Sequence, residues 1–225
     1  MRRLVLALAL ALATPAFAEE FRVIPPPAVD AAAVTGPETA IFAGGCFWGV
    51  QGVFQHTAGV VSAVSGYAGG SASTANYTAV TTGTSGHAEA VKVTYDPQRI
   101  SYGRLLQIFF SVVHDPTQRD RQGPDVGSQY RSAIFTTSDA QQTTAKAYIA
   151  QLDAAKAYGR PIVTTVASLP GCFVAEDYHQ NYLTLHPRQP YIVFNDLPKI
   201  ANLKELFAQD YLDKPTLVRR DQMAQ

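Results

Sequence analysis

Cys46 is the residue around which this sequence can do chemistry. It lies in the segment Gly44-Gly45-Cys46-Phe47-Trp48-Gly49, where a phenylalanine and the chain's only tryptophan follow the thiol and glycines flank them. A thiol in the first turn of a helix faces unpaired backbone N–H groups and the positive end of the helix dipole, and both favour the nucleophilic thiolate. The segment therefore predicts a reactive cysteine, although a cysteine taken alone is more often a disulfide partner or a small buried hydrophobe.

Glu89 is the second residue whose position suggests chemistry. If the run 86–97 forms a strand, Glu89 shares one face with Val91, Val93 and Tyr95. A carboxyl group on an apolar face is costly when ionised, so burial should raise its pKa and keep a proton available for donation. The alternative is that Glu89 reaches solvent at the strand end and has no chemical role.

Two kinds of nucleophilic chemistry fit Cys46. One is acyl transfer with His87, His114 or His179 as the base. The other is redox chemistry, in which the thiolate attacks an electrophilic sulfur and passes through a sulfenic acid or a disulfide. The adjacent Phe-Trp pair suits a small apolar group held at the reactive sulfur better than a peptide backbone. The histidines lack zinc spacing and the glycines lack nucleotide-binding spacing, so we expect neither a metal nor a nucleotide.

The pattern of apolar residues indicates which elements position these groups. A buried strand over 39–43 should lead into Cys46, and a helix with apolar residues at helical spacing should follow it to Phe54. Further elements are expected in chain order as strand 59–65, loop 71–86, strand 86–97, helix 101–113, strand 132–136, helix 141–156, strand 162–167 and helix 198–207. This order predicts an α+β fold, a two-layer α/β sandwich whose mixed sheet has a ferredoxin-like strand–helix–strand–strand–helix–strand core.

The chain begins with the features of a secretory signal peptide. Residues 1–18 combine two arginines, an apolar run over 4–12 and the small-residue site Ala16-Phe17-Ala18. The apolar run is too short to cross a bilayer core of roughly 30 Å. We therefore expect secretion, in a bacterium to the periplasm, with cleavage after Ala18.

The rest of the chain divides into three parts. Residues 19–38 read as a Pro-rich N-terminal arm, 39–212 as a single catalytic domain and 213–225 as a loose C-terminal tail. Removal of the two arginines of the signal peptide leaves the mature chain slightly acidic and without a basic run. This composition argues against nucleic acid or a membrane surface as a partner.

Several ordered motifs together resemble the A-type peptide-methionine (S)-sulfoxide reductases. The resemblance covers about residues 39–207 and includes the segments 45–49, 66–70, 86–89, 114–117, 122–132 and 175–180. It implies the two-layer α/β fold, the reduction of methionine (S)-sulfoxide in peptides and proteins, and a role in repair after oxidative damage.

The resemblance also implies roles for particular residues. The family's nucleophile matches Cys46 and its acid matches Glu89, while Phe47 and Trp48 match the aromatic cage around the sulfoxide methyl group.

Three further residues match groups of the family's site. Tyr77 and Tyr130 match the tyrosines that bind the sulfoxide oxygen, and Asp125 matches a carboxylate of the polar loop. On this basis Cys46 attacks the sulfoxide sulfur, Glu89 donates a proton to the oxygen, and Cys46 is left as a sulfenic acid.

Recycling is where the chain departs from many members of the family. Those members carry resolving cysteines in a C-terminal tail, whereas this chain has none after Cys172. Either Cys172 resolves the sulfenic acid as a Cys46–Cys172 disulfide, or it is a core thiol and an external thiol attacks Cys46 directly. The resemblance implies no bound cofactor, a thioredoxin-like protein or other thiol as reductant, and oxidised proteins, peptides or free methionine sulfoxide as substrates. We also expect the protein to act as a monomer.

Two readings from other classes stay open on the sequence alone. A hydrolase or acyltransferase would use Cys46 with a histidine and need no reductant. A non-catalytic binding domain would use Cys46 and Cys172 in a structural disulfide, whose loss lowers stability by ~2–4 kcal/mol.

Overall fold

A six-stranded sheet forms the centre of the molecule, in a computed structural model that describes residues 23–169 and 172–223. The predicted signal peptide lies outside the described residues. The strand order is β7-β6-β1-β3-β2-β8. The strands are β1 (Glu38–Gly44), β2 (Val60–Ala68), β3 (Ala88–Tyr95), β6 (Ser132–Thr136), β7 (Thr165–Ser168) and β8 (Phe173–Val174), and a separate pair is formed by β4 (Arg121–Gln122) and β5 (Asp125–Val126).

The central part of the sheet confirms the predicted ferredoxin-like core. The order β6-β1-β3-β2 results from a strand–helix–strand–strand–helix–strand path in which all neighbours are antiparallel. The added β7 runs parallel to β6, so the sheet is mixed. The predicted strand 162–167 begins later than expected, at Thr165, because Ile162 bonds to the side chain of Asp153 and Val163 to the backbone of Pro116 instead of to β6.

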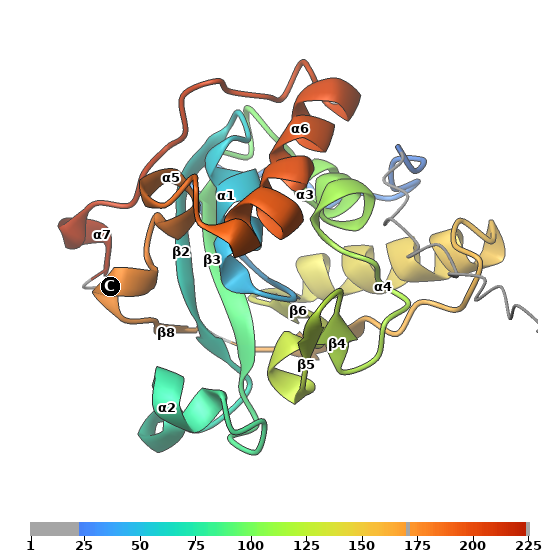
Figure 1. Cartoon of the computed structure of the whole chain (residues 1–225). Helices are drawn as coiled ribbons and strands as arrows, with labels where there is room; N and C mark the ends of the chain where they lie inside the picture. Colours follow the sequence, from blue (N-terminus) through green and yellow to red (C-terminus); the bar gives the residue numbers. More distant parts are fainter. Residues whose placement is uncertain (1–22, 170–171, 224–225) are drawn as a thin grey trace, which may run out of the picture.

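The longer helices lie on one side of the sheet, whereas α2 (Tyr77–Val80) lies beyond the ends of β2 and β3 (Figure 1). The α-helices are α1 (Phe47–Gln55), α2 (Tyr77–Val80), α3 (Tyr102–Ile108), α4 (Asp139–Ala154), α5 (Tyr182–Leu185), α6 (Leu197–Leu206) and α7 (Arg220–Met223). Short 3-10 helices are η1 (Ala72–Thr74), η3 (Ser128–Tyr130) and η4 (Asp177–His179), and π-helical segments are η2 (Phe109–Val113) and η5 (Ile192–Asp196). Apolar residues of α1, α3, α4 and α6 form one core cluster with the face of the sheet that these helices cover. None of the helices within residues 23–169 and 172–223 is long and apolar enough to cross a membrane.

Alternation along the strands gives the sheet two different apolar faces. Phe42 of β1 belongs to the helix-covered core, whereas its neighbours Ile41 and Ala43 belong to a smaller cluster on the opposite face. Cys172 and Leu169 pack against this second cluster. The sheet is therefore buried on both faces, with the larger core on the side of the helices.

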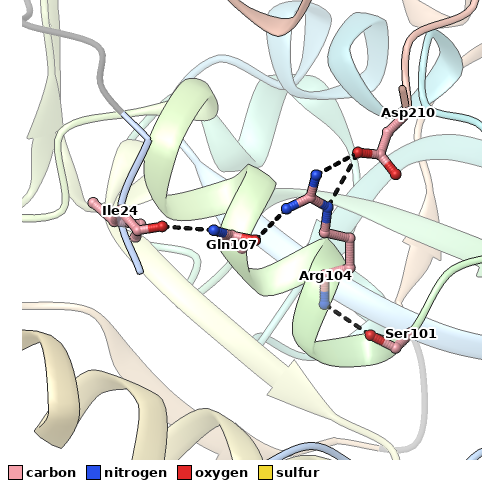
Figure 2. Close-up of polar contacts among 5 residues, drawn as sticks. All are labelled: Ile24, Ser101, Arg104, Gln107 and Asp210. Carbon is pink, nitrogen blue, oxygen red and sulfur yellow. Dashed lines mark hydrogen bonds and ion pairs between the residues drawn. The ribbon is translucent and has the colours of Figure 1, made fainter. Parts of the chain in front are cut away.

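The N-terminal arm is packed on the domain. Ile24, which lies in the predicted arm 19–38, is only 2% exposed, and its carbonyl accepts a 2.6 Å hydrogen bond from the side chain of Gln107. Figure 2 shows how Arg104 continues this chain of contacts, because its guanidinium donates to Gln107 and also to Asp210 at 2.6 Å. Contacts from α3 thus connect the arm with the region that precedes the C-terminal tail.

The tail is also held, in contrast to the loose segment that we expected. Within its described part, Val218 is 8% exposed and exchanges two hydrogen bonds with the side-chain amide of Asn181. The backbone N–H of Thr216 donates to the carbonyl of Gln55 at the end of α1. These long-range backbone contacts cannot be read from the local composition, which resembles that of a linker.

The stacked rings around Phe42 should contribute most to the stability of the core. Phe42 is fully buried, and its ring centre lies 5.0 Å from Phe54, 5.0 Å from Phe109 and 6.3 Å from Tyr102. We predict that Phe42→Ala lowers the free energy of unfolding by ~3–5 kcal/mol in denaturant titrations, because it leaves a cavity. Val61→Ala, at a site that is 45% exposed, should stay within about 0.5 kcal/mol, and equal effects of the two changes would contradict the prediction.

Candidate active site

The thiol of Cys46 lies where β1 ends and α1 begins, as the sequence predicts. Cys46 is the N-cap residue of α1 and is 8% exposed. Gly45 has a φ of +91°, and a Cβ atom there would lie 2.6 Å from the side chain of Gln122. Only glycine fits this backbone conformation and this close approach. The glycine turn thus carries the chain from the buried strand directly to the N-terminus of the helix.

Glu89 lies next to Cys46 on the helix-covered face of β3. Its side chain is 3% exposed, and Oε2 accepts a 3.0 Å hydrogen bond from the backbone N–H of Phe47, the first residue of α1. Burial raises the pKa of Glu89 to about 8, although the Phe47 N–H acts in the opposite direction. The carboxyl group is therefore mainly protonated at neutral pH, as expected for a buried acid.

The ionisation of Cys46 differs from our expectation. Burial raises the pKa of the thiol well above its ordinary value, and the carboxyl groups of Glu89, Asp196 and Asp125 raise it further. The backbone N–H of Trp48 favours the thiolate but does not outweigh these effects. The prediction of a thiolate favoured by the helix N-terminus is wrong for the free protein, because desolvation exceeds the stabilisation that the helix end provides.

An aromatic cluster surrounds the residues that follow the thiol. Trp48 is half-buried, stacks on Tyr182 at 3.8 Å between ring centres and meets Tyr191 edge-on at 5.9 Å. Its indole Nε1–H donates a 3.2 Å hydrogen bond to Nδ1 of His179. Phe47 is 1% exposed and lies behind Trp48, 4.9 Å from the His179 ring. The cluster forms an apolar wall beside Cys46.

Tyr77 and Tyr130 approach the same site from two other elements. Tyr77 is the first residue of α2 and Tyr130 the last residue of η3. Burial raises the pKa of both phenols, and the next largest contribution in each case is the nearby Glu89 carboxyl group. Both phenols are therefore close enough to feel the charges of Glu89 and Cys46, and their protonated hydroxyl groups can donate hydrogen bonds.

Asp125 joins the site through the polar loop. It starts β5, and its Oδ2 accepts a short hydrogen bond from the Tyr191 hydroxyl. Burial raises its pKa, while Tyr191 and Lys199 oppose this effect. The structure thus brings together all the predicted residues apart from Cys172: Cys46, Phe47, Trp48, Tyr77, Glu89, Asp125 and Tyr130.

Cys172 lies on the other side of the sheet. It packs with the smaller apolar cluster, and a Cβ atom on Gly66 of β2 would lie 2.7 Å from its Sγ atom. Both cysteines are free, and burial raises the pKa of Cys172 to about 11. The reading as a domain with a structural Cys46–Cys172 disulfide is therefore not supported.

None of the histidines considered as bases contacts Cys46 within the described structure. His87 bonds to the backbone of Gly70 and Ser71, and His114 bonds to Ser132 and to a carbonyl of η2. His179 is engaged by Trp48. The acyl-transfer reading lacks its base. Likewise, no cluster of metal-binding side chains occurs in the described part of the chain.

Sequence reasoning did not foresee the roles of four residues that build the site. They are the ring partners Tyr182 and Tyr191, the indole acceptor His179, and Glu176, which accepts hydrogen bonds from the Tyr77 N–H and the Tyr67 hydroxyl at 2.9 and 2.8 Å. The only signal for them is the density of aromatic and polar residues after Cys172. Their partners lie about 100 residues away or more in most cases, so spacing along the chain does not reveal them.

The assembled groups can perform one type of chemistry well. They place a buried thiol beside a protonated carboxyl group, two phenolic hydrogen-bond donors and an apolar wall. Such a site suits a small apolar group with a polar, proton-accepting oxygen near the sulfur.

Comparisons with known proteins agree with this geometry. The sequence profile described as peptide methionine sulfoxide reductase matches residues 38–211. The chain is 60% identical over 190 residues to "Peptide methionine sulfoxide reductase MsrA 2" of Mesorhizobium japonicum, covering 84% of this chain and 97% of that protein. It is 48% identical to the protein of the same name in Synechocystis, covering 86% of this chain and 90% of that protein.

Solved structures show the same fold. Reduced Mxr1 from Saccharomyces cerevisiae matches with a TM-score of 0.62 and 30% identity, over 71% of this chain and 91% of that one. Methionine sulfoxide reductase A of Corynebacterium diphtheriae matches with a TM-score of 0.59 and 37% identity, over 69% and 78% of the two chains. With the profile match and the close relatives, these similarities confirm the resemblance: the chain belongs to the peptide methionine sulfoxide reductase family.

Proposed function

We propose that this reductase acts on peptide-bound methionine (S)-sulfoxide through Cys46, with Glu89 as the proton donor. One observation carries the assignment of roles: the carboxyl group of Glu89 is bound to the same helix end that presents the Cys46 thiol, and it holds its proton at neutral pH. Tyr77 and Tyr130 are then the donors to the sulfoxide oxygen, and Phe47 and Trp48 form the wall for the methyl group. Asp125 acts by holding the Tyr191 hydroxyl.

The reaction balances without a further reactant. The Cys46 sulfur attacks the sulfoxide sulfur while Glu89 protonates the oxygen, and the thiol proton of Cys46 returns to Glu89. The substrate S–O bond breaks and a new S–O bond forms on Cys46, so methionine leaves and a Cys46 sulfenic acid remains. The substrate sulfur gains the two electrons that the Cys46 sulfur loses.

Regeneration of the thiol requires two further thiol equivalents. We propose that a thioredoxin-like protein or another external thiol attacks the Cys46 sulfenic acid directly. The position of Cys172 on the opposite face of the sheet supports this route over a Cys46–Cys172 disulfide. The protein repairs oxidised methionine, and its action as a monomer without a bound cofactor is part of the proposal.

Single-turnover mass spectrometry tests the nucleophile and the route of recycling. Reduced protein mixed with methionine (S)-sulfoxide without reductant should release one methionine per chain and retain one added oxygen atom. Cys46→Ser should release none, because the nucleophile is missing. Cys172→Ser is the matched control and should behave like the wild type.

Two outcomes would contradict these expectations. Methionine release by Cys46→Ser would exclude Cys46 as the nucleophile. A loss of two hydrogen atoms from the wild type, absent in Cys172→Ser, would show that Cys172 resolves the sulfenic acid.

The pH dependence tests the role of Glu89. The proposed reaction starts with a proton on both Glu89 and Cys46, and burial raises the pKa of Glu89 to about 8. The single-turnover rate should therefore be constant below about pH 8 and fall above it, because Glu89 then loses the proton that it donates.

Replacement of Glu89 provides the comparison. Glu89→Gln keeps an acceptor for the Phe47 N–H but has no proton to donate, so the rate should fall by ~10²–10⁴-fold. The variant should also lack the decrease in rate above about pH 8, because the carboxyl group that titrates there is absent. A variant with the wild-type rate and pH profile would exclude Glu89 as the acid.

We also propose that the protein is exported to the bacterial periplasm. The support is the basic start, apolar run and small-residue site of residues 1–18. N-terminal sequencing of protein from the periplasmic fraction should begin at Glu19. Recovery of the chain from the cytoplasm with Met1 retained would refute export.

A further inference from the structure

His179 occupies the centre of the aromatic wall. Its side chain is 2% exposed, and the ring centre lies 4.9 Å from Phe47, 5.9 Å from Trp48, 4.7 Å from Tyr77 and 4.2 Å from Tyr178. It is thus in contact with both residues of the proposed methyl-binding wall and with one proposed donor to the sulfoxide oxygen. The mechanism above assigns it no role.

The hydrogen bond from Trp48 determines which tautomer His179 adopts. An indole N–H can only donate, so Nδ1 of His179 must be the unprotonated nitrogen. Burial lowers the pKa of His179, so the ring is neutral at pH 7 and its proton lies on Nε2. That Nε2–H is buried and has no hydrogen-bond partner among residues 23–169 and 172–223.

An unpartnered buried donor is unfavourable and calls for an explanation. Here the same ring orientation supplies the acceptor for Trp48. In this orientation Nε2–H of His179 has no hydrogen-bond acceptor, while Nδ1 accepts the hydrogen bond from the Trp48 indole.

The backbone around His179 is anchored on both sides. Gln180 bonds through its side chain to Gln51 of α1 and to the backbone of Ser65 of β2. Glu176 accepts from the backbone N–H of Tyr77. Since α1 also carries Trp48, the acceptor and the indole are held relative to one common frame.

The other contacts of Trp48 do not define its orientation in the same way. The stack on Tyr182 is nearly parallel, with an interplanar angle of 9°, and it holds the plane of the indole without a hydrogen bond. The bond to Nδ1 is directional and selects one orientation of the ring.

We propose that His179 is a positioning residue, which fixes the Trp48 indole through Nδ1 and thereby sets the shape of the wall that receives the methyl group. This inference rests on the proposed function for its kinetic consequence, but the indole–imidazole bond can be tested without any turnover.

Substitutions at His179 separate the acceptor from the bulk of the ring. In His179→Asn the amide oxygen can occupy the place of Nδ1, whereas His179→Leu has similar branching and no acceptor. We expect His179→Leu to lower kcat/KM for an oxidised peptide about tenfold, mainly through a higher KM, with dithiothreitol as reductant. His179→Asn should recover most of this loss.

The sole tryptophan of the chain provides a readout that does not depend on activity. The emission maximum and anisotropy of Trp48 should change in His179→Leu and resemble the wild type in His179→Asn. In wild-type protein, the single indole N–H resonance should exchange slowly with solvent, a measurement that needs no variant.

The outcomes distinguish this inference from the proposed function. Equal KM values and equal fluorescence for His179→Leu and His179→Asn, or rapid exchange of the wild-type indole N–H, would overturn the role of His179. Failure of the wild type to form methionine would instead overturn the proposed function. The fluorescence and exchange measurements would then still show whether His179 orients the Trp48 indole.

Discussion

The hydrogen bond from the Phe47 N–H to the Glu89 carboxyl group connects the two elements on which the site depends. It is 3.0 Å long and joins the first residue of α1 to a buried position of β3. Because Cys46 is the residue that precedes Phe47, this bond also sets where the acid lies relative to the thiol. The desolvation that accompanies it makes both groups hold their protons, so the site is an uncharged acid–thiol pair until a polar substrate enters.

Glycines make this close packing around α1 feasible. Gly45 provides the left-handed turn before Cys46, as described above. Gly49, one turn further on, would place a Cβ atom 2.1 Å from Oδ1 of Asp196, which forms a buried ion pair with Lys199 at 3.3 Å. The helix can therefore lie directly against a buried carboxylate, whose charge adds to the raised pKa of Cys46. A larger residue at either position would separate elements that the site requires in contact.

The sheet lies between the two thiols of the chain. Cys46 belongs to the helix-covered side with Glu89 and the aromatic wall, whereas Cys172 packs with small apolar residues on the other side. Side chains of neighbouring strand positions point to opposite faces, and Cys172, next to β8, lies against Gly66 of β2 on the face away from Tyr67. This arrangement keeps Cys172 apart from the thiol and acid of the site, in line with the proposed attack on Cys46 by a thiol from outside the chain.

The sequence by itself determined the strand–turn–helix around Cys46, the buried face of β3 that includes Glu89, and the order of elements that yields the ferredoxin-like core. These features depend on local patterns: glycine at a turn, alternation along a strand and helical spacing of apolar residues. The roles of Tyr77, Tyr130 and Asp125 came from the family resemblance, since nothing in their local spacing singles them out.

Only the tertiary structure decided the protonation of Cys46, the face on which Cys172 lies, the docking of the tail, and the contacts of Glu176, His179, Tyr182 and Tyr191. Local helix geometry favours a thiolate at Cys46, but the solvent excluded by distant segments reverses that preference. Likewise, the hydrogen bond between Trp48 and His179 spans 131 positions of the chain. Burial and long-range contacts are properties of the folded arrangement, and short-range sequence patterns do not contain them.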